Sequence, residues 1–295
     1  MNRILRNSLN SFAKNFGLFS SNLASTIVSL LRICVLSKVG AAIKSRKYSQ
    51  LKLHDNCVVL ANGPSLKSAI EEGIDCLEES DVFCVNLFFK SDAFWIIKPR
   101  FYFVVDEQFF DPTYDRTKEQ VREMREALTK IDWEMYLVTS PTVVNAGILS
   151  NLNNNNIKVI RMNSTAADGF SWFKKLVYNL NLGMPRCQTV TNFAIMAAVN
   201  LHYSNVYLYG ADHSWTRDLM VDDNNVTCYG DRHVYNTQLS VIKLDYSISE
   251  LLHDFANMFE SHKTINEFAL YKGVNIINCT KGSFIDAYKR KVENL

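Results

Sequence analysis

From Asn56 onward, short apolar runs alternate with longer segments in which apolar residues recur at helical spacing. This alternation is typical of a parallel β-sheet that carries helices on both faces. We therefore expect a single α/β domain with a doubly wound, mainly parallel, Rossmann-like sheet. The pattern predicts strands at 56–61, 82–86, 101–105, 134–139, 157–161, 205–209 and 274–278, and helices at 66–79, 114–131, 168–182, 189–202 and 247–271.

The segment before this domain has a different pattern. Residues 16–43 are rich in apolar side chains but contain charged residues, and a charge in the middle of a membrane span costs roughly 2.5–3.5 kcal/mol. A spanning helix is therefore disfavoured, and an amphipathic helix lying on an anionic leaflet is favoured. A helix packed on the body or on a partner subunit of a homo-oligomer is the alternative. The residues expected near the head groups are Arg32, Lys38, Lys44, Arg46 and Lys47.

Charge is unevenly distributed along the 295 residues. Residues 1–54 contain nine Lys and Arg and no Asp or Glu, whereas the rest contains 23 basic and 30 acidic residues. The basic segment suits an anionic surface, and the mildly acidic body argues against a nucleic-acid partner. We expect residues 1–50 to form a basic, amphipathic, membrane-associating segment and residues 51–295 to form the α/β domain. The seven cysteines form no CxxC pair and no secretory signal is visible, which predicts a cytoplasmic protein held peripherally on the inner face of the cytoplasmic membrane.

The first segment with candidate chemistry follows the strand at 56–61. An apolar run ends in Asn62-Gly63-Pro64-Ser65 and continues into a helix, so the turn lies at the carboxyl end of a strand, where α/β sheets bind ligands. Gly63 lets the backbone approach a ligand closely, and Ser65 can cap the helix or donate to a phosphate. The turn is too short for a Walker loop and lacks the spacing of a dinucleotide fingerprint. An ordinary strand-to-helix turn is the alternative.

A second segment contains Thr189 and Thr191 at the start of an apolar helix, followed by the strand 205–209 and Gly210-Ala211-Asp212. The free N–H groups and the positive dipole end of a helix start favour an anionic group. An Asp after a strand can accept a hydrogen bond from a ribose or substrate hydroxyl. Taken singly, Thr189 would be a helix cap and Asp212 a turn residue.

Together these segments resemble the family 42 glycosyltransferases, which are bacterial CMP-sialic acid sialyltransferases. The resemblance covers about 55–290 in the same order. It implies a CMP-sugar donor and a bacterial surface glycan acceptor such as lipopolysaccharide. In the family a Ser-Gly follows the first Thr, where this chain has Val190-Thr191, so Thr191 is the candidate replacement donor. The residues that the resemblance places at the nucleotide are Asn62, Gly63, Ser65, Asn86, Asp106, Thr189, Thr191 and Asp212.

A third segment, 228–235, resembles the lid of the same family, in which a His serves as general base and a Tyr contacts a phosphate. The resemblance implies a polar, mobile lid at about 213–245, with His233 as the base and Tyr229 at the phosphate. Histidine is the natural base near neutral pH, and Arg232 could offset the charge of the leaving phosphate. His213 is the rival base.

Two acidic pairs, Asp106-Glu107 and Asp222-Asp223, could hold Mg²⁺ or Mn²⁺ against a nucleotide diphosphate. No Asp-x-Asp follows a strand, and no His or Cys set has zinc spacing, so we expect a metal-independent glycosyltransferase without a cofactor. One alternative is a transferase that uses a UDP-hexose, with a metal on Asp106 and Glu107. Another is a pyrophosphokinase or motility accessory protein of the domain of unknown function 115 type, whose pterin pyrophosphokinase relatives share the Gly63-Pro64-Ser65-Leu66 turn. A non-enzymatic scaffold is the third.

Overall fold

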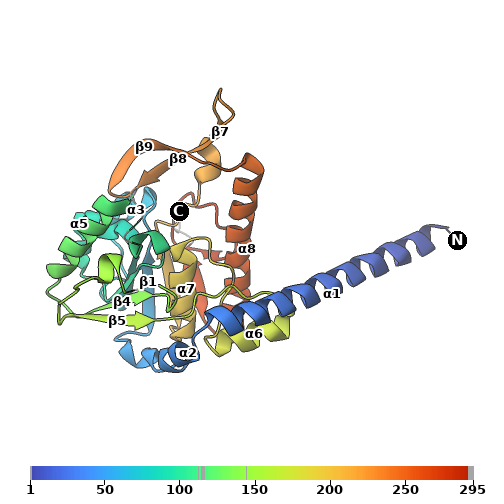
Figure 1. Cartoon of the computed structure of the whole chain (residues 1–295), viewed down its shortest axis with the longest axis horizontal. Helices are drawn as coiled ribbons and strands as arrows, with labels where there is room; N and C mark the ends of the chain where they lie inside the picture. The colour runs from blue at the N-terminus through green and yellow to red at the C-terminus, as the bar shows by residue number, and fades with distance from the viewer. Residues whose placement is uncertain (1, 112, 114–116, 144, 292–295) are drawn as a thin grey trace.

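The computed structural model describes residues 2–111, 113, 117–143 and 145–291, and the side chains of all of these except 2–12 and 236–239. It confirms the expected fold (Figure 1). Eight parallel strands form one sheet in the order β11-β10-β6-β1-β2-β3-β4-β5. Their bounds are Asn56–Leu60 for β1, Ser80–Val85 for β2, Phe101–Phe103 for β3, Met135–Thr139 for β4, Ile157–Arg161 for β5, Asn205–Tyr209 for β6, Asn275–Asn278 for β10 and Lys289–Arg290 for β11.

The strand order reverses at β1, which lies between β2 and β6. Leu60 pairs with Cys84 on one side and with Tyr209 on the other, so the three strands end at the same level. Ligands of open α/β sheets bind at the carboxyl edge where the strand order reverses. The turn after β1 and the Gly210-Ala211-Asp212 segment after β6 therefore emerge side by side.

Helices cover both faces of the sheet, which explains why β1 is a continuous apolar run rather than an alternating one. The residues Cys57 to Leu60 have no exposed surface. Helix α7 (Val190–Asn200) is apolar on all sides because it is buried between the sheet and α8 (Ile248–Lys272). The other helices of the body are α2 (Val39–Ser45), α3 (Ser65–Glu72), α4 (Asp92–Ile97), α5 (Lys118–Thr129) and α6 (Ser171–Asn179).

The expected lid segment contains an antiparallel sheet, which corrects the expectation of a polar loop, while its role as a lid stays a prediction. Its strands β7 (Leu219–Val221), β8 (Thr227–His233) and β9 (Asn236–Lys243) stand above the carboxyl edge of the main sheet (Figure 1). Asp222 fixes the β7–β8 turn, because its Oδ1 accepts the N–H groups of Asn224 at 2.9 Å and Val226 at 3.0 Å. The Asp and Asn residues that suggested a loop form this turn. The predicted helix 66–79 is also shorter, since Gly73, with φ 90°, ends α3.

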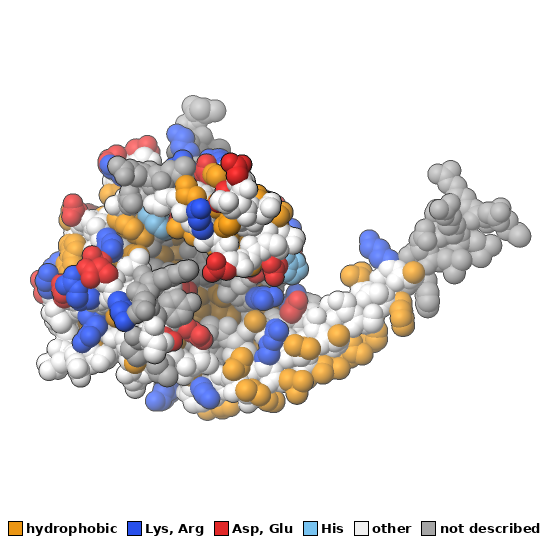
Figure 2. All heavy atoms as spheres, turned by 45° about the horizontal axis from the view of Figure 1, so that its top comes forward, with side chains coloured by type: hydrophobic (Ala, Val, Ile, Leu, Met, Phe, Trp, Pro, Cys, Tyr) orange, Lys and Arg blue, Asp and Glu red, His pale blue; other side chains and the backbone are white. Residues whose placement is uncertain are grey.

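Helix α1 (Asn2–Leu36) projects from the body (Figure 1). Its last part docks against the segment before α6, where Ser29 Oγ donates to the Asp168 carbonyl at 2.9 Å and Thr26 Oγ1 accepts from Phe170 N at 3.1 Å. Gly169 allows this close approach, because a Cβ there would lie 2.1 Å from Thr26 Oγ1. The stretch Ala13–Leu36 is long and apolar enough to cross a membrane by length and composition. Figure 2 shows hydrophobic side chains along one side of this helix.

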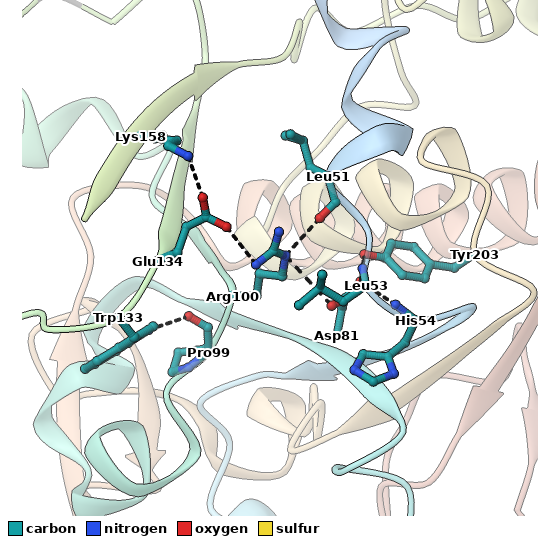
Figure 3. A network of polar contacts seen from close by, with 10 residues as sticks. All are labelled: Leu51, Leu53, His54, Asp81, Pro99, Arg100, Trp133, Glu134, Lys158 and Tyr203. Atoms are coloured by element: carbon teal, nitrogen blue, oxygen red, sulfur yellow. Dashed lines mark hydrogen bonds and ion pairs between the residues drawn. The ribbon is translucent and has the colours of Figure 1, made fainter. Parts of the chain in front are cut away.

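At the opposite, amino edge of the sheet, a polar network fixes the segment that leads into β1 (Figure 3). Asp81, 2% exposed, accepts hydrogen bonds from Leu53 N at 2.9 Å and from the Tyr203 hydroxyl at 2.7 Å. Arg100 donates to the Leu51 carbonyl at 2.8 Å and pairs with Glu134 at 3.0 Å. These contacts tie residues 51–54 to the body, on the edge away from the candidate site.

Candidate active site

A cavity of about 410 Å³ opens at the carboxyl ends of β1, β2, β3 and β6, beneath β8. It brings together segments that are up to 172 positions apart in the chain, from Ala61 to His233. Of the predicted site residues, Ser65 alone does not line it. Those that do are Asn62, Gly63, Asn86, Asp106, Thr189, Thr191, Asp212, Tyr229, Arg232 and His233.

The floor of the cavity is a contact between the turn after β1 and the end of β6. Gly63 N donates to the Gly210 carbonyl at 2.8 Å, and a Cβ on Gly63 would lie only 2.0 Å from Asp212 Oδ2. Ser65 does not cap α3, whose N-cap is Pro64; its hydroxyl donates to Asp212 Oδ2 at 2.8 Å. Burial raises the pKa of Asp212, and the bond from Ser65 opposes that shift. Ser65 therefore positions Asp212 from behind the cavity wall.

One wall presents hydrogen-bond acceptors. Asn62 Nδ2 donates to the Val85 carbonyl at 3.1 Å, and Asn86 Nδ2 donates to Asp106 Oδ2 at 2.8 Å. A carbonyl and a carboxylate as partners fix both amides with their oxygens turned away. Both Oδ1 atoms are buried and have no partner among the described residues. Burial raises the pKa of Asp106, and the bond from Asn86 opposes that shift. A ligand reaches these two amide oxygens only after the side chains shift, whereas the partly exposed Asp106 lines the cavity and offers its carboxylate to hydroxyl or amino hydrogens.

The start of α7 forms the side of the cavity that favours anions. Thr189 is the N-cap and accepts from Asn192 N at 3.4 Å, while Val190 and Thr191 also line the cavity. The first N–H groups of a helix have no partner within the helix, and its dipole attracts negative charge. Thr189 does not follow a strand. It reaches the sheet edge because α7 runs back from that edge toward the start of β6.

A histidine–carboxylate pair faces the cavity from β8. His233 Nε2 lies 3.0 Å from Asp231 Oδ2, and Trp215 Nε1 donates to Asp231 Oδ1 at 3.1 Å. Burial alone would raise the pKa of Asp231, but the bond and charge of His233 and the indole N–H lower it overall. The Tyr235 ring stacks on His233 at 4.9 Å. A base oriented by a carboxylate is an arrangement typical of proton transfer.

Asp231 was missed from the sequence, although a signal was present. Tyr229, Asp231 and His233 are two residues apart, and residues i, i+2 and i+4 of a strand share one face. A register shift against β9 lies between Asp231 and His233, but the two side chains remain in contact. The Gly, Asp and Asn residues of the segment favour a loop, and this polarity conceals the alternation.

The rival base, His213, also lines the cavity, but its surroundings differ. It is 5% exposed, and burial lowers its pKa to about 3. A base of such low pKa is a weak proton acceptor near neutral pH. Its Nε2 is buried without a partner among the described residues, and its backbone has a φ of 50°. This environment favours His233 as the base and leaves His213 neutral.

The surroundings of two further predicted residues, Arg232 and Tyr229, determine how each could contact a ligand. Arg232 Nη1 donates to Asp218 Oδ2 at 2.9 Å, so its charge is balanced by a carboxylate that also lines the cavity. A guanidinium group has five N–H donors, so Arg232 can contact a phosphate while it keeps this pair. Burial raises the pKa of Tyr229 to about 12, so its hydroxyl remains a donor near neutral pH.

Of the two acidic pairs that could hold a metal, Asp106-Glu107 and Asp222-Asp223, only one residue lines the cavity. Asp106 lines the cavity and Glu107 does not. Asp222 pairs with Lys243 at 3.0 Å in the β7–β8 turn, outside the cavity lining. Within the part of the chain that the structure describes, no group of three or more His, Cys, Asp or Glu residues could hold a metal ion.

The fold and this cavity place the protein among Rossmann-like α/β proteins, and the comparison with protein families indicates a transferase. The family model described as 6-hydroxymethylpterin diphosphokinase MptE-like matches residues 34–218, and the chain belongs to this MptE-like family. The matched region contains the wall formed by Asn62, Asn86 and Asp106, which we call the acceptor wall because its oxygen atoms accept hydrogen bonds, and the start of α7. It ends before β8, so the His233–Asp231 pair lies outside it.

The fold is also similar to that of the MAf glycosyltransferase from Magnetospirillum magneticum AMB-1, with a TM-score of 0.50 at 17% sequence identity. The match covers 81% of this chain and 34% of that chain, so the shared part is about a third of the larger protein. No curated protein matches this chain significantly in sequence. The expected link to pterin pyrophosphokinases is confirmed, whereas the link to family 42 itself stays a prediction.

Proposed function

We propose that this protein is a glycosyltransferase that moves a sugar from a nucleotide-activated donor, a CMP-sugar, to a hydroxyl of a bacterial surface glycan. The observation that carries the proposal is the joining of three features in one cavity. They are the acceptor wall at Asn62 and Asn86, the helix start at Thr189, and the His233–Asp231 pair. These features suit, in turn, the hydroxyl and amino groups of a nucleotide, its phosphate, and the proton of an acceptor hydroxyl.

In the proposed reaction the nucleotide lies against the Asn62–Ser65 turn, with its phosphate at the start of α7. His233 directs Nε2–H to Asp231, which leaves Nδ1 to take the acceptor proton. The acceptor oxygen bonds to the anomeric carbon as the bond from that carbon to the phosphate oxygen breaks. CMP then carries the negative charge away, stabilised by the α7 N–H groups and the Tyr229 hydroxyl.

Two observations support a sugar transfer. The structurally similar MAf protein is a glycosyltransferase. The basic N-terminal segment and the exposed apolar side of α1 also suit work on an acceptor at a membrane surface, such as lipopolysaccharide.

A second candidate is a diphosphokinase that uses ATP and a pterin alcohol, and the family match favours it. The carboxylates of the cavity also favour it, since Asp106, Asp212, Asp218 and Asp231 all line the wall. Such an acidic site suits a polyphosphate that is bound to a cation better than a polyphosphate without a cation. Asp106 and Asp212 are the residues that would hold Mg²⁺. A UDP-hexose transferase with a metal shares this argument.

The two candidates separate in one assay. The full chain is incubated with CMP-sugars, UDP-hexoses, or ATP with a hydroxymethylpterin, each with Mg²⁺ or with EDTA, and products are measured by mass spectrometry. CMP release with sugar transfer in EDTA, lost in His233→Gln, supports the proposal. AMP release that needs Mg²⁺, together with a diphosphorylated pterin, would replace it with the diphosphokinase.

A further inference from the structure

A second cavity, of about 370 Å³, lies where α1, α6 and α8 meet. We propose that this α1–α6–α8 cavity binds an oxyanion, a phosphate or a carboxylate, carried by the acceptor. The inference rests on the proposed function for the identity of the ligand, but the anion site itself does not. Figure 2 shows Lys and Arg side chains where α1 meets the body.

Cations from three separate elements line this cavity. They are Arg32 of α1, Lys174 of α6 and Arg186 of the segment before α7. Lys174 lies 3.7 Å from Asp168, and the other lining carboxylate, Glu260, lies 3.8 Å from Lys263. Neither Arg32 nor Arg186 has an ion pair within the described part of the chain. Two uncompensated guanidinium groups facing one cavity suit an oxyanion, which they bind through paired N–H donors.

The other polar groups of the wall agree with this. The Asn257 side-chain nitrogen is buried and has no partner among the described residues, so it is a donor without an acceptor. The Ser261 hydroxyl donates to the Arg186 carbonyl and so holds the backbone of Arg186 against α8. A bound oxyanion would satisfy the buried amide, because an unpaired buried donor is unfavourable.

This cavity lies next to the active cavity. Arg186 precedes Gln188, which lines the active cavity and donates to Asp254 of α8 at 2.6 Å. Asp254 and Asn257 are three residues apart on α8, so they lie on one side of the helix. The chain from Arg186 to Thr189, at the start of α7, spans at most about 11 Å. An anionic group at Arg186 would therefore belong to a part of the acceptor that extends past the start of α7.

The anion site can be tested without any turnover. Inorganic pyrophosphate is titrated into the full chain while the guanidinium Nε–Hε signals are followed by nuclear magnetic resonance. The site predicts that the signals of Arg32 and Arg186 shift together, and that Arg186→Gln abolishes the shift at Arg32. The exposed Arg125 of α5 is the internal control and should not respond. No shift at either arginine overturns the anion site.

The acceptor assignment is tested by kinetics. With a phosphorylated or carboxylated acceptor, Arg186→Gln should raise the acceptor KM about tenfold, equivalent to about 1.4 kcal/mol, with kcat and donor KM unchanged. The KM of an uncharged acceptor of the same length, and the Arg125→Gln variant, should be unaffected. Pyrophosphate binding with no change in acceptor KM overturns the acceptor assignment. If pyrophosphate binds but no donor is turned over by any variant, the proposed function fails and the anion site stands.

Discussion

His233 Nε2 and Asp231 Oδ2 lie 3.0 Å apart, and both side chains belong to one strand, β8. The strand therefore sets the separation of base and carboxylate before any ligand binds. Trp215 holds the second oxygen of Asp231, which orients the carboxylate toward the histidine. The rest of the cavity is formed by segments that lie far apart in the sequence. His233 and Asp231, in contrast, are only two positions apart on β8.

The first prediction concerns this pair. His233→Gln should lower kcat by roughly 10²–10⁴ while leaving donor affinity nearly unchanged, because a base acts on the acceptor. Asp231→Asn should also lower kcat, because this carboxylate orients the base. His253→Gln on α8, outside the active cavity, is the matched control. Loss of turnover in His213→Gln with near wild-type rates in His233→Gln would transfer the role to His213.

The second prediction concerns pH and stability. Burial lowers the pKa of His213 to about 3, whereas an unfolded histidine titrates near 6.5. Between these values the unfolded chain binds more protons, so the free energy of unfolding should fall as the pH drops below about 6.5. The contribution of this residue is up to about 1.4 kcal/mol per pH unit. Urea unfolding of the wild type and of His213→Asn at several pH values measures it, and parallel slopes for the two proteins contradict the assignment.

The third prediction concerns the contact at the cavity floor. Gly63→Ala should destabilise the fold by roughly 1–3 kcal/mol through overpacking and should weaken nucleotide binding, since the new Cβ overlaps Asp212 and the Gly210 carbonyl. Gly40→Ala is the control, because a Cβ at Gly40 meets nothing within 4 Å. Thermal unfolding and nucleotide titration of both variants give the comparison. Equal behaviour of the two variants would show that the close packing does not hold in solution.

The fourth prediction concerns α1. The Phe19 ring already lies 5.5 Å from the Phe170 ring of the body, so the part of the apolar stretch before the docked residues, 13–18, is roughly 9 Å long, shorter than a hydrocarbon core of about 30 Å. We therefore expect α1 to lie on a membrane surface rather than to cross it. Phe16 and Leu23 are 63% and 43% exposed, and the double change to Glu should abolish binding to anionic vesicles.

Two further observations would check this use of α1. Binding of the wild type to anionic vesicles should weaken as salt rises, because the segment 1–54 is basic. Ser21→Glu is the control for each single change, Phe16→Glu or Leu23→Glu, because it adds the same charge at an exposed position roughly 140–160° around the helix from both residues. Protection of α1 from proteases on both sides of a vesicle would contradict a surface location.

The sequence predicted the main sheet well because its strands are buried on both faces and stand out as apolar runs. The turn at Asn62–Ser65 and the helix start at Thr189 were also predicted, since Gly, Pro and Thr have strong local preferences at such positions. That these segments meet in one cavity follows from strand order, which places β6 beside β1. The strand order was not among the predictions; the resemblance to a known family implied only that these residues lie at the nucleotide.

Other parts could not be predicted from local pattern. The strands β7 to β9 contain Gly, Asp and Asn, so polarity concealed their antiparallel pairing. The roles of Ser65 and Asp218 depend on partners 147 and 14 residues away, Asp212 and Arg232, which only tertiary contacts reveal. The docking of Thr26 beside Gly169 likewise depends on a tertiary contact between residues far apart in the sequence.

The most direct test of the central claim is calorimetric titration of the full chain with CMP, in EDTA. The account predicts binding to the wild type and an affinity reduced more than tenfold, about 1.4 kcal/mol, in Asn62→Ala, because the acceptor wall loses a buried oxygen. Asn205→Ala, which removes an amide at the start of β6 on the opposite edge of the sheet, should bind CMP as the wild type does. Equal affinity of Asn62→Ala and Asn205→Ala, or binding of ATP with Mg²⁺ in place of CMP, would contradict the account.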